Sequence, residues 1–141
     1  IFMGPIFSDE IRSKISKNSS LSYKGIINPS EVLKTLMSYD VLVLPTFHDG
    51  EGYPGIILEA FSIGMPVIST KWNSIPEIVS HNENGILVPI KDFESLKNEI
   101  LNFNQNKYIK LRTKAITTFS KFDSELVNYN FFEKINFFDK C

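Results

Sequence analysis

The chain has 141 residues, of which 43% are apolar and 22% are charged, and its formal net charge is −1. This composition is typical of a globular domain long enough to bury a hydrophobic core, and it excludes a disordered or fibrous chain. The charge excludes a dense basic surface of the kind that binds nucleic acid by counterion release, so we expect no nucleic-acid partner.

The chain opens with an apolar segment, and Ile1 is not an initiator methionine. We therefore expect a piece of a longer protein. From residue 1 to residue 103, segments with the patterns of strands and helices alternate. Apolar runs predict strands, and capped or amphipathic segments predict helices. The predicted strands are 1–4, 21–27, 41–45, 65–70 and 86–89, and the predicted helices are 8–18, 29–39, 55–64, 75–80 and 92–103. This alternation predicts an α/β domain with a Rossmann-like, mostly parallel sheet and helices on both faces.

From Asn102 onward no segment has a strand pattern, and the remainder is predicted to be helical. We expect the sheet domain to comprise residues 1–122, with its N-terminal part missing, and a C-terminal helix to comprise residues 123–141. Aromatic residues from Phe131 to Phe138 give that helix an apolar stripe, which would pack on its own sheet, on an absent domain or on a second copy in a dimer. The single cysteine, Cys141, favours a reducing compartment, and we expect a cytoplasmic protein.

The segment LPTFHDGEGYPGIILEAFSIGMPVI, residues 44–68, joins a predicted buried strand to a helix. Ligands of parallel sheets bind outside the carboxyl ends of the strands, and the loop after Leu44 lies there. Gly50, Gly52 and Gly55 are expected to adopt positive φ and to let the backbone approach a ligand closely. Free amides at the start of the helix would donate hydrogen bonds to anionic or oxygen-rich groups.

Two carboxylates flank this join: Glu51 lies in the loop, and Glu59 lies more than one turn into the helix. An ionised carboxylate accepts two hydroxyl hydrogens at once, which suits a sugar. Glu59 is therefore a candidate for binding a ribose diol, and Glu51 for binding a second sugar.

These residues resemble the donor-binding segment of the retaining glycosyltransferases of family 4, which have the GT-B fold. The resemblance extends over about residues 2–101 and includes further motifs in the family's order. These are Lys24-Gly25, Asp40 to Pro45, Gly64 to Ile68, Pro76 to Val79 and Asn84 to Val88.

The resemblance implies a role for each site residue. Glu59 would bind the ribose hydroxyls of a nucleotide-sugar donor, and Glu51, the catalytic candidate, would lie beside the transferred sugar. The backbone of Gly52, Tyr53 and Gly55 would face sugar hydroxyls and phosphate. Pro54 stands where many members have glycine, which removes one N–H.

The resemblance also implies what lies outside this chain. An Arg and a Lys for the diphosphate would precede residue 1, and an N-terminal domain would bind most of a glycan, lipid-linked or other hydroxyl acceptor. The full-length enzyme would act in polysaccharide biosynthesis. It would be cytoplasmic or, as the alternative, peripheral at the inner face of the membrane. This fragment alone is expected to be inactive.

Two other functions stay open at this point: a nucleotide-sugar epimerase of the same fold, and a non-catalytic module that binds nucleotide-sugar or serves as an interaction surface. No cofactor is expected. The acidic triplet Asp49-Gly50-Glu51 resembles a metal motif of another glycosyltransferase fold, but a lone triplet is weak evidence, and we expect no metal. We expect His48 to be solvated and Glu77 to interact with the dipole of its helix. Lys71 and Trp72, just past the end of a predicted strand, would either line the cleft or close a loop, and we favour the loop.

Overall fold

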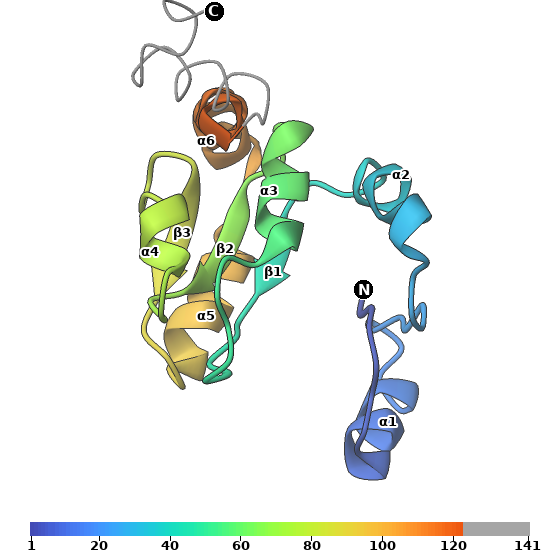
Figure 1. Cartoon of the computed structure of the whole chain (residues 1–141). Coiled ribbons are helices and arrows are strands. Elements are labelled where there is room, and N and C mark those ends of the chain that lie inside the picture. The colour runs from blue at the N-terminus through green and yellow to red at the C-terminus, as the bar shows by residue number, and fades with distance from the viewer. Residues whose placement is uncertain (123–141) are drawn as a thin grey trace, which may run out of the picture. The chain divides into compact units, whose positions relative to one another are not determined.

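The computed structural model describes residues 1–122 (Figure 1). The predicted helix at 123–141 and its proposed dimer contact lie outside the described residues. The chain divides into two compact units, residues 1–35 and the residues from 36 onward.

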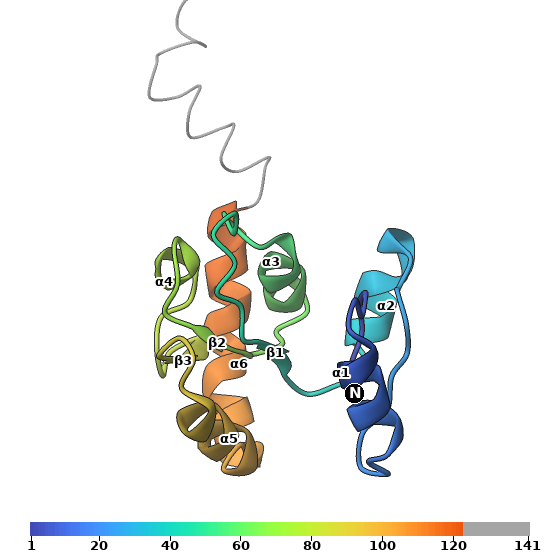
Figure 2. The same cartoon turned by 90° about the horizontal axis from the view of Figure 1, so that it is seen from below.

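The second unit contains a three-stranded parallel sheet in the order β1-β2-β3. The strands are β1 (Leu42–Leu44), β2 (Val67–Thr70) and β3 (Gly85–Val88). The helices of this unit are α3 (Gly55–Ser62), α4 (Ile75–Ile78), α5 (Phe93–Leu101) and α6 (Gln105–Phe119), followed by the short 3-10 helix η2 (Ser120–Phe122). Figure 2 shows α3 and α4 on one face of the sheet and α5 on the other. The predicted parallel α/β fold with helices on both faces is therefore confirmed.

The core lies on both faces of β2, all four residues of which are buried. On one face Ile68, Ile86 and Val88 pack with Leu111 of α6. Ile57, Ala60 and Phe61 give α3 its fully buried face, and Ile75 and Ile78 do the same for α4. A continuous apolar strand is what a parallel sheet covered on both faces requires.

Two glycines in this unit have steric roles. Gly64 has a φ of 72° and follows α3, so it ends the helix as predicted. Gly85 begins β3, and a Cβ built there would lie 2.5 Å from the carbonyl oxygen of Val67. Because no side chain fits at that distance, glycine permits the close pairing of β2 with β3.

Helix α5 begins as predicted. The carboxylate of Asp92 accepts hydrogen bonds from the backbone N–H of Ser95 at 3.0 Å and from its hydroxyl at 2.7 Å. Both bonds stabilise the ionised carboxylate, and the pKa of Asp92 is lowered from its ordinary value, chiefly by the backbone N–H of Ser95 and next by its hydroxyl.

The first unit contains α1 (Asp9–Ser16). Ser8, the first residue of the predicted helix 8–18, is its N-cap and accepts from the N–H of Ile11 at 3.4 Å. The 3-10 helix η1 (Pro29–Glu31) and the short α2 (Val32–Leu36) follow, and α2 crosses the boundary between the units. The helix predicted for 29–39 is therefore shorter than expected.

The strands predicted for 1–4 and 21–27 are wrong as extended strands, because only an isolated parallel bridge joins Phe2 to Tyr23. Neither segment has the burial of a core strand, since Phe2 is 48% exposed and Ile26 is 75% exposed. A single bridged pair fixes too few residues for a ladder, and a unit of this size has no second layer to cover such side chains.

Candidate functional site

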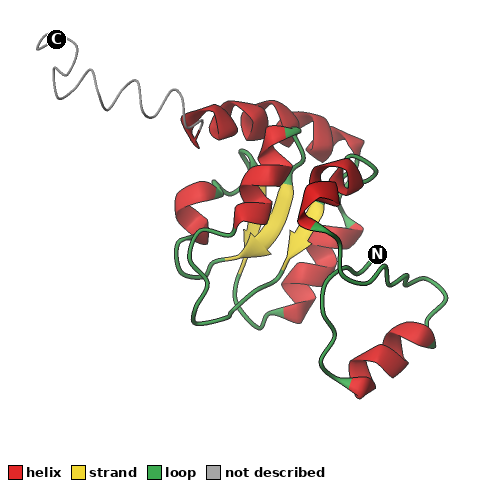
Figure 3. Cartoon of the chain, turned by 45° about the vertical axis from the view of Figure 1, so that its right-hand side comes forward, coloured by secondary structure: helices red, strands yellow, loops and turns green. Residues whose placement is uncertain are grey.

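The strands of the second unit end at one edge, where three loops gather (Figure 3). The loop 45–54 follows β1, the loop 71–74 follows β2, and the turn 89–92 follows β3. The carboxyl ends of parallel strands are the usual place for a ligand in such a sheet. The predicted site residues lie on the first of these loops and on the helix that it enters.

Side chains from the end of β2 and the loop after it hold the loop 45–54 by its carbonyl oxygens. The indole N–H of Trp72 donates to the carbonyl of His48 at 2.8 Å, and the amide of Asn73 donates to those of Asp49 and Glu51 at 3.3 and 3.0 Å. We call this set of bonds the carbonyl clamp. Its other members are the bonds from the Thr70 hydroxyl to the carbonyl of Thr46 and from the Ser74 hydroxyl to the carbonyl of Gly52.

The clamp has a consequence for the amides of the loop. With the carbonyls bonded to the protein, the N–H groups of Gly50, Gly52 and Tyr53 donate no hydrogen bond to any residue in the range 1–122. The first turn of α3 adds further donors, because Pro54 at its N-cap provides no side-chain acceptor. The segment that enters α3 therefore presents hydrogen-bond donors to a ligand.

The glycines of this loop do not have the positive φ expected from the sequence. Among the described residues, positive φ occurs at Gly4, Gly25 and Gly64 and at three other residues, one of which is Asn73 with a φ of 44°. The side chain of Asn73 belongs to the carbonyl clamp. The positive φ is therefore found in the loop 71–74 and not at the glycines of the loop 45–54. A Cβ built on Gly52 or Gly55 would meet no atom within 4 Å, so both glycines border open space.

Glu51 and Glu59 are both half-buried, and Glu59 is the fifth residue of α3. Neither carboxylate forms a hydrogen bond or an ion pair with another residue of the described part of the chain. Glu51, Gly52, Tyr53 and Gly55 follow one another on a single segment, and Glu59 lies one turn further along. Both carboxylates are therefore available to a ligand.

Tyr53 is held by a contact that the sequence did not predict. Its hydroxyl donates a hydrogen bond to the carboxylate of Glu77 in the first turn of α4. This bond is the main reason that the pKa of Tyr53 is raised, followed by desolvation and by the charge of Glu77. The expected place of Glu77 near the helix start is confirmed, and its bond to Tyr53 is additional.

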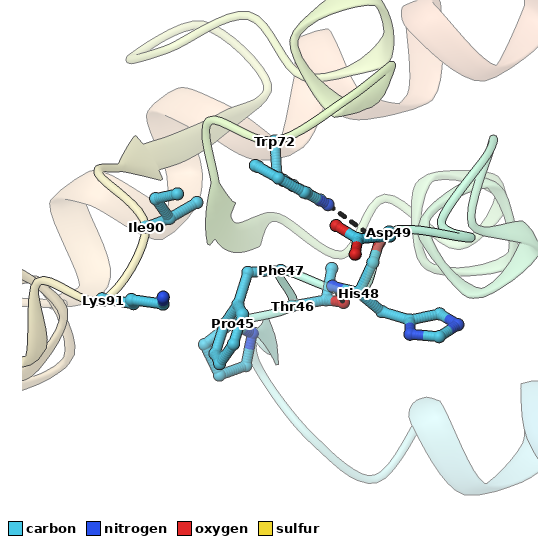
Figure 4. Close-up of a pocket in the computed structure, with 8 residues that line it drawn as sticks. All are labelled: Pro45, Thr46, Phe47, His48, Asp49, Trp72, Ile90 and Lys91. Atoms are coloured by element: carbon cyan, nitrogen blue, oxygen red, sulfur yellow. Dashed lines mark hydrogen bonds between the residues drawn. The ribbon is translucent and has the colours of Figure 1, made fainter.

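A pocket of about 600 Å³ opens beside this segment (Figure 4). Trp72, for which lining the cleft was the less favoured of the two expected roles, forms part of its wall as well as of the clamp. The five predicted site residues are not among those that line it. The lining residues are Pro45, Thr46, Phe47, His48, Asp49, Trp72, Ile90 and Lys91. The place of Trp72 just past the end of a predicted strand was the sequence signal for this role.

Within residues 1–122 there is no group of three or more His, Cys, Asp or Glu side chains placed to hold a metal ion. The same residues include no helix with the length and apolar character needed to cross a membrane.

Comparison with known proteins identifies the family. The family described as "Glycosyl transferases group 1" matches residues 2–106. The chain belongs to this family. The amylovoran biosynthesis glycosyltransferase AmsK of Erwinia amylovora is 34% identical over 87 residues, which are 59% of this chain and 21% of AmsK. The putative colanic acid biosynthesis glycosyltransferase WcaL of Escherichia coli K12 is 34% identical over 112 residues, which are 76% of this chain and 26% of WcaL. The chain thus spans about a quarter or less of these glycosyltransferases.

Solved structures agree on the fold. Anabaena HepE in complex with UDP-glucose superposes with a TM-score of 0.75 at 21% identity, over 90% of this chain and 36% of HepE. The C-terminal domain of LpcC, a glycosyl transferase group 1 family protein from Francisella tularensis, superposes with a TM-score of 0.61 at 24% identity. That match covers 79% of this chain and 60% of the LpcC domain.

Proposed function

We propose that this chain is the nucleotide-sugar-binding, C-terminal domain of a retaining family 4 glycosyltransferase with the GT-B fold. The full-length protein would transfer a sugar from a nucleotide-sugar to a hydroxyl of a glycan or lipid-linked acceptor during polysaccharide biosynthesis. Membership in the glycosyltransferase family supports this proposal. HepE was solved with UDP-glucose, and the LpcC structure is a C-terminal domain.

The observation that carries the proposal is the orientation of the loop before α3. Its carbonyls are bonded by the carbonyl clamp, and its free amides continue into the open first turn of α3. Such an array of donors, together with the positive end of the helix dipole, stabilises negative charge. In the proposed reaction these donors would stabilise the leaving diphosphate while the acceptor hydroxyl attacks from the same face.

The two free carboxylates complete the proposed donor site. Glu59 would accept hydrogen bonds from both ribose hydroxyls of the donor, and Glu51 would contact the sugar that is transferred. The backbone N–H groups of Gly52, Tyr53 and Gly55 would bind sugar hydroxyl and phosphate oxygens. The open space beside Gly52 and Gly55 leaves room for these groups.

We place the full-length enzyme in the cytoplasm or at the inner face of the membrane. The sequence has one cysteine, which fits a reducing compartment, and the proposed lipid-linked acceptor would be reached at a membrane surface.

The deciding experiment incubates the full-length gene product with UDP-glucose and other nucleotide-sugars, in the presence and absence of a cell-derived glycan acceptor. Proton NMR of the products distinguishes transfer, hydrolysis and epimerisation, and also gives the anomeric configuration. We expect acceptor-dependent transfer with retained configuration. Epimerised nucleotide-sugar would contradict the proposal, as would inverted product or a complete lack of reaction with a protein that binds the donors.

A further inference from the structure

We propose that the pocket between Phe47, Trp72 and Lys91 is a saccharide subsite that binds a pyranose ring of the acceptor, so that the C-terminal domain holds part of the acceptor itself. The inference rests on the proposed function, and it adds a ligand to residues that the donor site does not use.

The walls of the pocket have the chemistry of a sugar-binding surface. Phe47 and Trp72 provide aromatic faces, on which the apolar C–H face of a pyranose packs. The indole of Trp72 is fixed by its bond to the carbonyl of His48, so its ring is held in place before any ligand arrives. A rigid aromatic side chain loses little conformational entropy on binding.

Charged groups stand at opposite sides of this aromatic surface. Figure 4 shows Lys91 on the side of the turn after β3 and the carboxylate of Asp49 on the side of the loop after β1. The ammonium of Lys91 lies 5.5 Å from the centre of the Phe47 ring, a cation–π distance that holds it at the pocket. A carboxylate accepts hydroxyl hydrogens and an ammonium donates to hydroxyl oxygens, so a sugar ring would find partners at both edges.

The pocket's dimensions also fit a small ligand. Its volume of about 600 Å³ falls within the range of about 300–1,000 Å³ that is usual for small-molecule sites. A monosaccharide unit fits with room for part of the next unit, as is required when the acceptor is a chain.

The position of the pocket favours the acceptor over the donor as the source of the sugar. The first half of the loop, through Asp49, lines the pocket, whereas the proposed donor residues begin at Glu51 and continue into α3. The two sites are thus neighbours along one loop but share no residue. This is the relation expected of an acceptor sugar beside a donor sugar, because the two must meet for transfer.

The test uses Trp72, the single tryptophan among the 141 residues, as an internal reporter. The fluorescence of Trp72 is followed while the chain is titrated with methyl glycosides of glucose, galactose and mannose at up to about 100 mM, a range that suits weak binding. Saturation-transfer NMR on the same glycosides gives a second measure of binding. UDP is titrated in parallel to report on the donor site.

Three variants assign the signals. Phe47→Ala and Lys91→Asn change the pocket, and Asn tolerates the positive φ of Lys91. Phe93→Ala is the matched control, because Phe93 is 73% exposed on α5 and does not line the pocket. We expect at least one glycoside to bind, Phe47→Ala and Lys91→Asn to weaken it about fivefold or more, and UDP affinity to stay within about twofold.

Each contrary outcome is distinct. If no glycoside perturbs Trp72 or shows saturation transfer in the unmodified chain, the subsite does not exist. If the pocket variants weaken UDP and glycoside alike, or if UDP displaces the glycoside, the pocket belongs to the donor site and the acceptor assignment is wrong. A chain that binds glycosides but no UDP would contradict the proposed donor function and leave the subsite standing.

Discussion

The hydroxyl of Tyr53 is hydrogen-bonded to the carboxylate of Glu77, which lies 24 residues later in the sequence. Tyr53 is the last residue before the cap of α3, and Glu77 lies in α4, so the bond joins the proposed donor loop to the helix that follows β2. The side chain of Tyr53 is 53% exposed and gains little from burial. Its bond to Glu77 therefore fixes the backbone that carries the free N–H of Tyr53.

Tyr53→Phe should weaken binding of the nucleotide-sugar about two- to tenfold, because it removes one hydrogen bond that orders the loop. Isothermal titration with UDP measures the change. The matched control is Tyr23→Phe, which removes a 2.7 Å bond to the carbonyl of Gly4 in the other unit and should leave UDP affinity unchanged. Equal losses in both variants would contradict a local role for Tyr53.

The hydrogen bond between Tyr53 and Glu77 should depend on pH. The pKa of Tyr53 is raised above its ordinary 10.0, so the bond is fully present below pH 10.0 and is lost as the pH rises through the raised value. In Glu77→Gln the carboxylate is gone, and the pKa of Tyr53 should fall toward 10.0. The difference in ultraviolet absorbance between each protein and its Tyr53→Phe counterpart isolates this titration. An unchanged pKa in Glu77→Gln would show that the bond does not form.

Glu59→Gln should reduce the affinity for UDP and for the nucleotide-sugar about ten- to a hundredfold, because a charge-assisted pair of bonds to the ribose diol is lost. Glu94→Gln is the matched control, since Glu94 forms a surface ion pair with Lys97 on α5. Titration with UDP and with 2′-deoxy-UDP separates the ribose contact from general effects. If Glu59→Gln binds UDP as the unmodified protein does, Glu59 does not hold the ribose.

Two glycine substitutions should affect different properties, stability in one case and donor affinity in the other. In Gly85→Ala the new methyl group meets the carbonyl of Val67, and we expect a loss of about 1–3 kcal/mol in the free energy of unfolding, measured with urea. In Gly52→Ala the methyl group enters open space, so stability should be retained while donor affinity falls, because the methyl group occupies the proposed ligand position. A Gly52→Ala protein with normal donor affinity would place the ligand elsewhere.

The cap of α5 should give stability a pH dependence. The lowered pKa of Asp92 means that its contribution is present above the ordinary value of 3.8 and is lost as the pH falls through the lowered value. Asp92→Ala should therefore lower Tm at pH 7, and the difference from the unmodified protein should shrink in acid. Asn104→Ala removes the uncharged cap of α6, which accepts from Lys107 at 3.1 Å, and should lower Tm by a pH-independent amount. Parallel behaviour of the two variants would contradict this account.

Activity of the full-length enzyme should survive EDTA. Within the part of the chain that the structure describes, Asp49 and Glu51 belong to no group of three potential ligands, and the proposed charge stabilisation comes from amides. Transfer that is abolished by EDTA and restored by Mn²⁺ would contradict this prediction and make the acidic triplet a metal site.

The sequence predicted the elements whose signals are local. Apolar runs located β1, β2 and β3, and Ser8 and Asp92 marked helix starts that the structure confirms. The carbonyl clamp could not be predicted, because Trp72, Asn73 and Ser74 have the composition of an ordinary surface loop. Their partners are backbone carbonyls about 24 residues away, which carry no sequence signature. The strand-like pattern at 1–4 failed for a related reason: apolar pattern indicates burial, but burial requires a covering layer.

The residues that hold the loop through the carbonyl clamp differ from the loop side chains that line the proposed sugar subsite. Every bond in the clamp ends on a main-chain oxygen, so these bonds do not require particular side chains at Phe47, His48 or Asp49. If the proposed subsite binds sugar, substitutions at Phe47, His48 or Asp49 should therefore change its sugar preference while the amides before α3 keep their positions. In the proposed donor site, such a scaffold would let sugar preference change without altering the amides that we propose bind the diphosphate.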